Sequence, residues 1–310
     1  MNKPFICPIC CENNWKKKKS IDSNIKHVPP GLTRPNSINC NICECASCGL
    51  EFNKDFLHNK NYRALYTDQM IYSQNSHSHP YTIEPLYSFD IIHALNRFSK
   101  EKGNLLEIGF QNINVLEQFK ASGWKVEGVD LDSSAVKRAQ NKGYTTYQSD
   151  IEDKIFDQKR YDAIVAIGVF EHIENPLRFL LRINELLNSN GLLLLQLPNP
   201  QSLNAFCSKF SIHGWDMYGE PGHVFLYRKS HLITLLKRYC FSIKLYHTAT
   251  IRSRGKIPFI PFRNHYLETK MRFFIQQSNF ILACYTALLK LLDFFSLGDT
   301  HIIIAQKVKV

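Results

Sequence analysis

The stretch from Asn104 to Asp130 limits the fold of this chain more than any other part of the sequence. A short apolar run, residues 105–108, stops at Gly109, an amphipathic segment follows, and a second apolar run, residues 126–129, ends on Asp130. Strand, turn, helix and strand within about thirty residues is the size of one βαβ unit with parallel strands. A carboxylate at the end of the second strand, about twenty residues after the turn, is where nucleotide-binding α/β folds hold a ribose hydroxyl.

At these residues the chain resembles the class I S-adenosylmethionine (SAM) methyltransferases. In that family the first strand usually leads into an acidic residue, an apolar residue and the sequence Gly-x-Gly-x-Gly, which Glu107, Ile108 and Gly109 match. Gln111 and Ile113 replace the next two glycines, where side chains are expected to crowd the cofactor or re-route the loop. The resemblance implies SAM as cofactor and a doubly wound, seven-stranded Rossmann-like sheet whose last strand is antiparallel.

The rest of the chain fits that plan. Apolar runs predict strands near residues 105, 126, 145, 162, 192, 243 and 302. Periodic segments predict helices over residues 86–100, 133–142, 177–187, 230–239 and 279–295, with Asn190-Gly191 ending the third of these. We therefore expect a zinc-ribbon-like domain over residues 1–58, a connector and covering helix over 59–100, and a methyltransferase domain over 101–310 with a cap insertion at about 249–299.

The resemblance also implies a set of SAM-binding positions, which are Glu107, Gly109, Gln111, Asp130, Leu131, Asp150 and Gly168. In the family, the acid at the position of Asp130 holds the ribose hydroxyls and the acid at the position of Asp150 meets the adenine amino group. Each carboxylate has an ordinary structural alternative, because Asp is common at strand ends and helix caps.

A second signature, VFEHIENP, follows the fourth predicted strand at the edge where open α/β sheets bind ligands. Glu171 and His172 resemble the Glu-His pair of many small-molecule and glycan-associated methyltransferases, and His223 lies in a Pro-x-His block of the same subgroup. His172 is the best candidate for a general base, since the usual pKa of His is near neutrality. A structural role is the alternative for all three. Some relatives bind a divalent metal through Glu-x-x-Glu-His, but Gly168 stands at the first position, so no metal is predicted here.

Seven of the ten cysteines lie within the first 48 residues. Two C-x-x-C pairs separated by a long loop are typical of a zinc ribbon, because each pair offers two thiolates to one tetrahedral ion. Cys7 with Cys10 is the first pair. We prefer Cys45 with Cys48 as the second, because Gly49 allows a sharp turn there, while Cys40 with Cys43 has the same spacing and stays open. Four thiolates close the coordination shell, so the zinc is expected to be structural.

The formal charge of +11 favours anionic surroundings, although the run Lys16–Lys19 is expected to be a solvated loop. No N-terminal signal peptide and no apolar span of about 18 residues is visible, so a cytoplasmic protein is expected. The predicted helix at 279–295 and the Arg and Lys residues before it either cap the sheet or lie on the inner face of an anionic membrane. Nucleic acid is not the predicted partner, because no aromatic residues alternate with Arg and Lys in a binding stripe.

The sequence combines a zinc ribbon, a SAM loop, a Glu-His pair and a Pro-x-His block. A chain with this combination resembles bacterial methyltransferases of surface-polysaccharide and modified-sugar biosynthesis. The sequence therefore predicts a SAM-dependent methyltransferase that acts on a sugar or glycan intermediate or another small metabolite. The replaced glycines support one alternative, a methyltransferase-like protein that no longer catalyses and serves as a binding or scaffolding partner.

Overall fold

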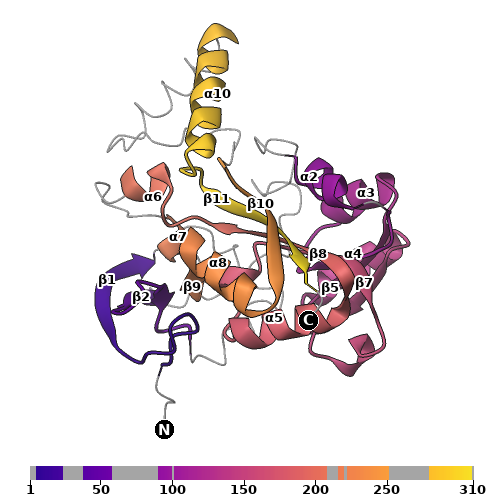
Figure 1. Ribbon diagram of the computed structural model, residues 1–310, viewed down its shortest axis with the longest axis horizontal. Helices are drawn as coiled ribbons and strands as arrows, with labels where there is room; N and C mark the ends of the chain where they lie inside the picture. The colour runs from indigo at the N-terminus through magenta and orange to yellow at the C-terminus, as the bar shows by residue number, and fades with distance from the viewer. Residues whose placement is uncertain are drawn as a thin grey trace, which may run out of the picture.

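The computed structural model describes residues 5–23, 38–57, 90–99, 101–207, 216–219, 222–250 and 279–308. These residues form two β-sheets: a seven-stranded sheet flanked by helices and a four-stranded sheet that contains the N-terminal strands (Figure 1). The predicted α/β fold with a small N-terminal β-domain is confirmed.

The large sheet has the strand order β10-β11-β8-β7-β4-β5-β6. The strands from β8 to β6 pair in parallel, whereas β11 is antiparallel to both β8 and β10. Its strands are β4 (Asn104–Ile108), β5 (Lys125–Asp130), β6 (Thr145–Gln148), β7 (Tyr161–Ile167), β8 (Leu187–Pro198), β10 (Phe241–Ala249) and β11 (Thr300–Lys307). The seven predicted strands and the antiparallel return of the last one are therefore confirmed.

Helices cover both faces of this sheet, because side chains of its central strands alternate between two apolar layers. Ile164 of β7 packs in the layer that contains α5 (Pro176–Leu186) and α8 (Lys229–Arg238). Its neighbour Val165 packs in the layer that contains α2 (Ile91–Phe98) and α3 (Asn114–Ala121). The other described helical elements are α4 (Ser133–Asn141), the 3₁₀ turns η2 (Lys154–Phe156) and η3 (Phe170–His172), α6 (Leu203–Cys207), and α7 (Asp216–Gly219), which contacts β1 and β2 of the small sheet.

Two helix boundaries differ from the prediction. The helix expected over residues 86–100 is described only from its cap at Asp90, whose carboxylate accepts the His93 N–H; residues 58–89 lie outside the described part. The helix expected to reach Asn190 ends at Leu186, because Leu187 already pairs with Tyr161 as the first residue of β8. Asn190 instead has φ +64° within that long strand.

The small sheet has the antiparallel order β1-β2-β3-β9, formed by β1 (Trp15–Ser23), β2 (Ile38–Cys45), β3 (Glu51–Asn53) and β9 (Phe225–Leu226). The run Lys16–Lys19, expected to be a loop, is an exposed part of edge strand β1, where lysines discourage pairing with other chains. Glu51–Asn53, within the segment predicted as the zinc-ribbon-like domain, forms β3. The last strand of this sheet, β9, comes from the region after β8, so the two sheets are joined through it.

The C-terminal part contains α10 (Asn279–Phe294), which rises from the edge of the large sheet before β11 (Figure 1). The rest of the predicted insertion, residues 251–278, lies outside the described residues. Among the described helices, α10 included, none combines the length and the hydropathy that crossing a bilayer requires.

Candidate active site and metal centre

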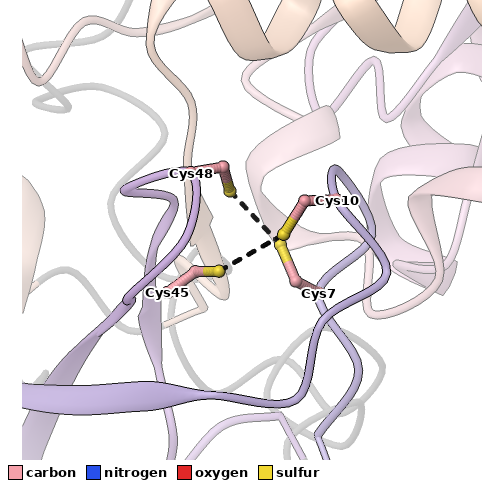
Figure 2. A group of neighbouring side chains, drawn as sticks. All are labelled: Cys7, Cys10, Cys45 and Cys48. Carbon is pink, nitrogen blue, oxygen red and sulfur yellow. Dashed lines mark hydrogen bonds between the residues drawn. The ribbon is translucent and has the colours of Figure 1, made fainter.

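Four cysteines come together next to the small sheet, where β2 ends at Cys45. The Cys7 and Cys48 sulfurs are 3.5 Å apart, as are those of Cys10 and Cys45, and all four lie within 4.8 Å of one another (Figure 2). A tetrahedral ion with Zn–S bonds of about 2.3 Å would separate its sulfurs by about 3.8 Å, so this group fits zinc. The pair preferred from sequence is the one the fold brings together; Cys43 is buried elsewhere in β2.

The two halves of the cysteine cluster have the same backbone geometry. Gly49 has φ +74° and its N–H donates to the Cys45 carbonyl at 2.9 Å. Cys11 takes the equivalent position after the first pair, with φ +64° and an N–H that donates to the Cys7 carbonyl at 2.9 Å. Each C-x-x-C pair is therefore a closed knuckle, and the left-handed residue after it is Gly in one and Cys in the other.

The predicted SAM loop follows β4 at the carboxyl end of the large sheet. Gly109 has φ +66°, and its N–H donates to the Val129 carbonyl at 2.8 Å. A Cβ atom on Gly109 would lie 2.6 Å from a methyl group of Val169, so both its conformation and its surroundings require glycine. The turn therefore brings β4, β5 and the end of β7 close together.

The two replaced glycines are accommodated by this chain. Gln111 adopts φ +41°, and its backbone N–H donates to the Asp130 carboxylate at 2.8 Å. Ile113 is buried in the layer beneath α3 and α4, together with Phe110. Phe110 packs so closely on Gly128 that a Cβ there would lie 2.7 Å from the ring. The loop therefore follows a course set by a left-handed Gln and a buried aromatic side chain.

Asp130 ends β5 and faces this loop. One carboxylate oxygen accepts the Gln111 N–H and the other accepts the Asp132 N–H at 2.9 Å. Because a carboxylate has about four acceptor positions, Asp130 can still accept from a hydroxyl group such as those of a ribose. Burial raises the pKa of Asp130, an effect that these backbone donors oppose. Leu131 follows directly and is half-buried.

Glu107, near the end of β4, is 3% exposed, and one of its carboxylate oxygens is fully buried with no hydrogen-bond partner among the described residues. Burial, and to a smaller degree the charge of Asp130, raises its pKa well above the usual value. A buried acceptor without a donor is costly unless a ligand supplies one. The α-ammonium group of SAM is such a donor, so this site fits the cofactor that the sequence implies.

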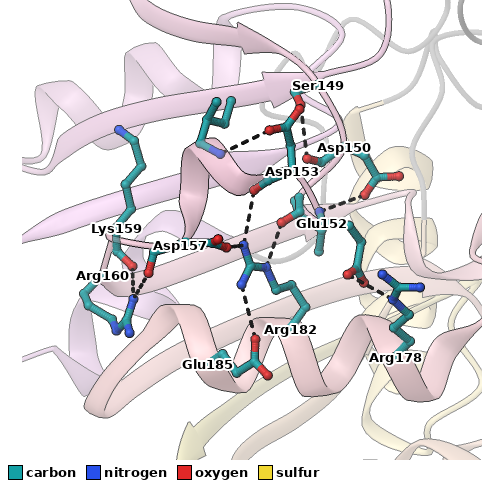
Figure 3. Close-up of polar contacts among 12 residues, drawn as sticks. Ser149, Asp150, Glu152, Asp153, Asp157, Lys159, Arg160, Arg178, Arg182 and Glu185 are labelled. Carbon is teal, nitrogen blue, oxygen red and sulfur yellow. Dashed lines mark hydrogen bonds and ion pairs between the residues drawn. The ribbon is translucent and has the colours of Figure 1, made fainter.

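Asp150 lies in the loop after β6, at the same sheet edge, and accepts the Glu152 N–H at 3.1 Å. Arg182 of α5 holds this loop through the Ile151 carbonyl at 2.9 Å and the Asp157 carboxylate at 2.7 Å (Figure 3). Sequence reasoning did not single out Arg182, because an Arg in a helix carries no signal of its tertiary partners. The loop that presents Asp150 is therefore fixed to the helix layer.

A second group of side chains lies beside the SAM loop. Glu171 and His172 are in η3, directly after β7, and His223 precedes β9. His223 Nε2 is 3.9 Å from a Glu171 carboxylate oxygen, and the two imidazole rings are 4.8 Å apart. One donor atom from each residue lies within 4.8 Å of the other two. The fold thus unites the three predicted catalytic residues, which we call the acceptor cluster.

The hydrogen bonds of the acceptor cluster fix its tautomers. His223 Nδ1 lies 2.9 Å from the Met217 carbonyl, to which it can only donate, so Nε2 of the neutral ring carries a lone pair facing Glu171. His172 is likewise bonded to the Gly222 backbone. One oxygen of Glu171 is buried without a partner among the described residues. The cluster therefore holds acceptor groups that a proton or a cation would satisfy.

Burial dominates the ionisation of the acceptor cluster. It raises the pKa of Glu171 to about 8 and lowers the pKa of His172 to about 4. The pKa of His223 is lowered to about 3 by burial and then by its neighbour His172. At neutral pH both histidines are therefore neutral, and Glu171 titrates near the pH at which enzymes usually work.

The cysteine cluster is connected to the acceptor cluster through hydrogen bonds. In α8, Arg238 donates to the Pro8 and Ile9 carbonyls at 3.1 and 2.6 Å, and His231 Nε2 donates to the Cys48 carbonyl at 3.0 Å. Both knuckles are thus attached to one helix.

Backbone hydrogen bonds from β3 complete the connection between the small sheet and the acceptor cluster. The Asn53 N–H of β3 donates to the Val224 carbonyl at 2.9 Å, and the Val224 N–H donates to the Glu171 carbonyl at 2.8 Å. Tyr227, fully buried and stacked on Phe170, packs in the same apolar cluster as Cys7. The spacing of motifs along the sequence contains no signal for this connection, because it depends on strand pairing between distant segments.

Comparison with known proteins gives one family match and several similar solved structures. The family model described as "Methyltransferase domain" matches residues 85–244, just over half of the chain. No curated protein matches the chain. Among solved structures, it is similar to a SAM-dependent methyltransferase from Archaeoglobus fulgidus (20% identity, 70% of this chain and 91% of that chain, TM-score 0.48). It is also similar to SAM-dependent methyltransferases from Methanosarcina mazei (14%, 72% and 100%, 0.47) and Mesorhizobium loti (14%, 69% and 96%, 0.47).

The match of the family model covers the strands and turns that hold Glu107, Gly109, Asp130 and the Glu171-His172 pair. The chain therefore belongs to the methyltransferase-domain family and is a SAM-dependent methyltransferase.

Proposed function

We propose that this protein transfers the methyl group of SAM to a hydroxyl of a sugar or glycan intermediate, with the acceptor cluster receiving the hydroxyl proton. The observation that supports this proposal best is a buried oxygen of Glu171 that has no hydrogen-bond partner among the described residues and belongs to a carboxyl beside His172 and His223. The sequence resemblance to methyltransferases of surface-polysaccharide biosynthesis supports the sugar acceptor.

In this proposal Glu107, Gly109 and Asp130 hold the cofactor, which supplies an electrophilic methyl group on a sulfonium. The backbone around Gly109 would surround the methionine part. The Glu107 oxygen that has no partner among the described residues would accept from the ammonium group, and Asp130 would accept from the ribose. Asp150 and Leu131 would border the adenine, and Gln111 and Gly168 would complete the loops on either side. Precise placement of the methyl group opposite the acceptor oxygen supplies most of the rate.

The acceptor cluster acts on the hydroxyl proton. An imidazole lone pair of His172 or His223 accepts it, and ionised Glu171 stabilises the imidazolium that results. Glu171 must be ionised for this role. Activity is therefore expected to increase as the pH rises toward about 8, the pKa to which burial raises this group.

Calorimetric titration with SAM, followed by methyl transfer to candidate sugars, tests the proposal. The wild type is expected to bind SAM, and Asp130→Ala to lose that binding. His172→Gln and His223→Gln should keep SAM affinity and lose transfer, whereas Glu174→Gln, an exposed neighbour, should keep both. A folded wild-type protein that fails to bind SAM would overturn the proposal.

A second role for the same three residues is a divalent-metal site. The sequence did not predict one, because Gly168 replaces a carboxylate, but His223 supplies a third donor within 4.8 Å. Two histidines and a carboxylate are a common ligand set for such ions. Measurement of Mn²⁺ binding by electron paramagnetic resonance distinguishes the two roles: the metal role requires a bound-ion spectrum that Glu171→Gln abolishes.

A further inference from the structure

The helix α10 turns an apolar face to solvent. Five large apolar side chains near its exposed face are between 47% and 78% exposed, namely Phe280, Leu288, Leu291, Phe294 and Phe295. Together with exposed Cys284 and Ala287 they recur at intervals of three and four residues, so they form one stripe along the helix. A stripe with this spacing normally faces a core, and contiguous apolar surface of this kind marks an interaction site.

The base of α10 is fixed to the large sheet. Asp293 is 4% exposed; its carboxylate accepts from the Thr250 hydroxyl at 2.9 Å, and its carbonyl accepts from the Thr248 hydroxyl at 3.1 Å. Asn199 also donates to the Gly298 carbonyl at 2.8 Å, which joins the turn after the helix to the end of β8. The exposed stripe is therefore presented by a helix with a firm attachment.

The attachment point is at the carboxyl edge of the sheet. Thr300, the first residue of β11, pairs with Pro198 at the end of β8 and with Ala249 at the end of β10. The SAM loop and the acceptor cluster follow β4, β5 and β7 at this same edge. A surface that covers the stripe would thus lie on the side of the molecule where the acceptor enters.

The charge of the sequence that precedes α10 indicates what covers the stripe. Residues 251–278, directly before α10 in the sequence, contain a single acid, Glu268, and six basic residues: Arg252, Arg254, Lys256, Arg263, Lys270 and Arg272. The whole chain has a formal charge of +11. An apolar helix face that follows a basic segment in the chain is suited to the interface of an anionic bilayer, where apolar side chains enter the acyl boundary and cations meet the headgroups.

We propose that α10 docks this protein on an anionic phospholipid surface through the stripe formed by Phe280, Leu288, Leu291, Phe294 and Phe295. The helix lies in the interface and does not cross the bilayer, in agreement with its length of 16 residues. This docking goes beyond the proposed methyl transfer and does not depend on it.

Co-sedimentation of the full chain with vesicles tests the docking. The probes are vesicles of phosphatidylcholine with an equal part of phosphatidylglycerol, and vesicles of phosphatidylcholine alone. The wild type is expected to bind the anionic vesicles at least about tenfold more strongly, and added salt should weaken this binding. Leu291→Asp should reduce it by about tenfold or more.

Leu181→Asp is the matched control, because Leu181 of α5 is 51% exposed and Leu291 is 52% exposed. It should bind vesicles as the wild type does, and both variants should keep SAM affinity, which separates docking from cofactor binding. Absence of binding to anionic vesicles, or equal loss in both variants, would overturn the proposal. So would a dimer in light scattering that Leu291→Asp dissociates without any effect on vesicle binding, since a second copy would then cover the stripe.

Discussion

Replacement of Glu171 by Gln tests the electrostatic description of the acceptor cluster most directly. The carboxyl is 3% exposed, and burial raises its pKa from 4.5 to about 8. Below pH 4.5 both the folded and the unfolded chain keep this proton. Between pH 4.5 and 8 the unfolded chain releases it while the folded chain keeps it, so the stability contributed at low pH is lost as the pH rises through this window.

The size of this loss of stability follows from the shift in the pKa of Glu171. Each pH unit in this window costs the wild type about 1.4 kcal/mol, so the full window costs about 5 kcal/mol and the penalty at pH 7 is about 3 kcal/mol. Gln does not titrate. The free energy of unfolding of Glu171→Gln is therefore expected to exceed that of the wild type by a difference that grows by about 1.4 kcal/mol for each pH unit.

Urea denaturation at a series of pH values between 5 and 8, a range that lies between the unfolded and the folded pKa of Glu171, measures this difference. His172 and His223, whose pKa values are lowered to about 4 and about 3, destabilise the fold as the pH falls below 6.5. Both are present in both proteins, so their contributions cancel in the difference. Glu174→Gln, which changes an exposed carboxylate, is the control and should leave the profile unchanged.

A difference that does not change with pH would refute this reasoning. Glu171 would then be ionised over the whole range, as expected if it binds a metal or pairs with a protonated histidine. A chelator that restores the slope would identify the metal as the cause.

Two further substitutions test the SAM loop and the cysteine cluster. Gly109→Ala should lower the free energy of unfolding by about 2 kcal/mol and weaken SAM binding, because the left-handed backbone and the contact with Val169 both oppose a Cβ. The control is Gly143→Ala, at φ +80° with no atom within 4 Å of the added Cβ, which should lose only the stability that the left-handed backbone costs. An equal loss of stability in the two variants would contradict the effect of the contact with Val169. Arg238→Ala should lower the free energy of unfolding by about 1 kcal/mol and speed zinc release to a chelator, since it removes the hydrogen bonds to the Pro8 and Ile9 carbonyls of the first knuckle. Lys237→Ala is its control. Identical release rates for the two variants in a colorimetric zinc assay would refute the idea that Arg238 stabilises the zinc site.

Sequence reasoning was most successful where local pattern and chemistry agree. Alternating apolar runs and the Gly109 turn determine a parallel α/β sheet, because strands buried on both faces and a left-handed turn leave few other structures for that sequence. The choice of Cys45 and Cys48 rested on Gly49, and its φ of +74° shows why that residue permits the knuckle. The roles of the predicted site residues and the bounds of the three predicted domains stay proposals.

Other features were decided by the tertiary structure alone. The family pattern predicts that Gln111 crowds the cofactor or re-routes the loop. In the structure, Asp130, nineteen residues later, accepts the Gln111 N–H and holds the left-handed turn. The run Lys16–Lys19 is a strand because β2 pairs with it. In both cases the stabilising partner is distant in sequence, so no local pattern contains it.

The acceptor cluster likewise has features that the sequence determines and features that only the tertiary structure determines. The residue types of Glu171, His172 and His223 determined that proton or metal chemistry was available, and the sequence order already placed the first two after a buried strand. The tertiary contact between the Val224 N–H and the Glu171 carbonyl brings His223 to within 3.9 Å of the Glu171 carboxylate, and burial there raises the pKa of that carboxyl. Identity of the reactive groups is a property of the sequence, whereas their distances and ionisation depend on desolvation by segments that are far away along the chain.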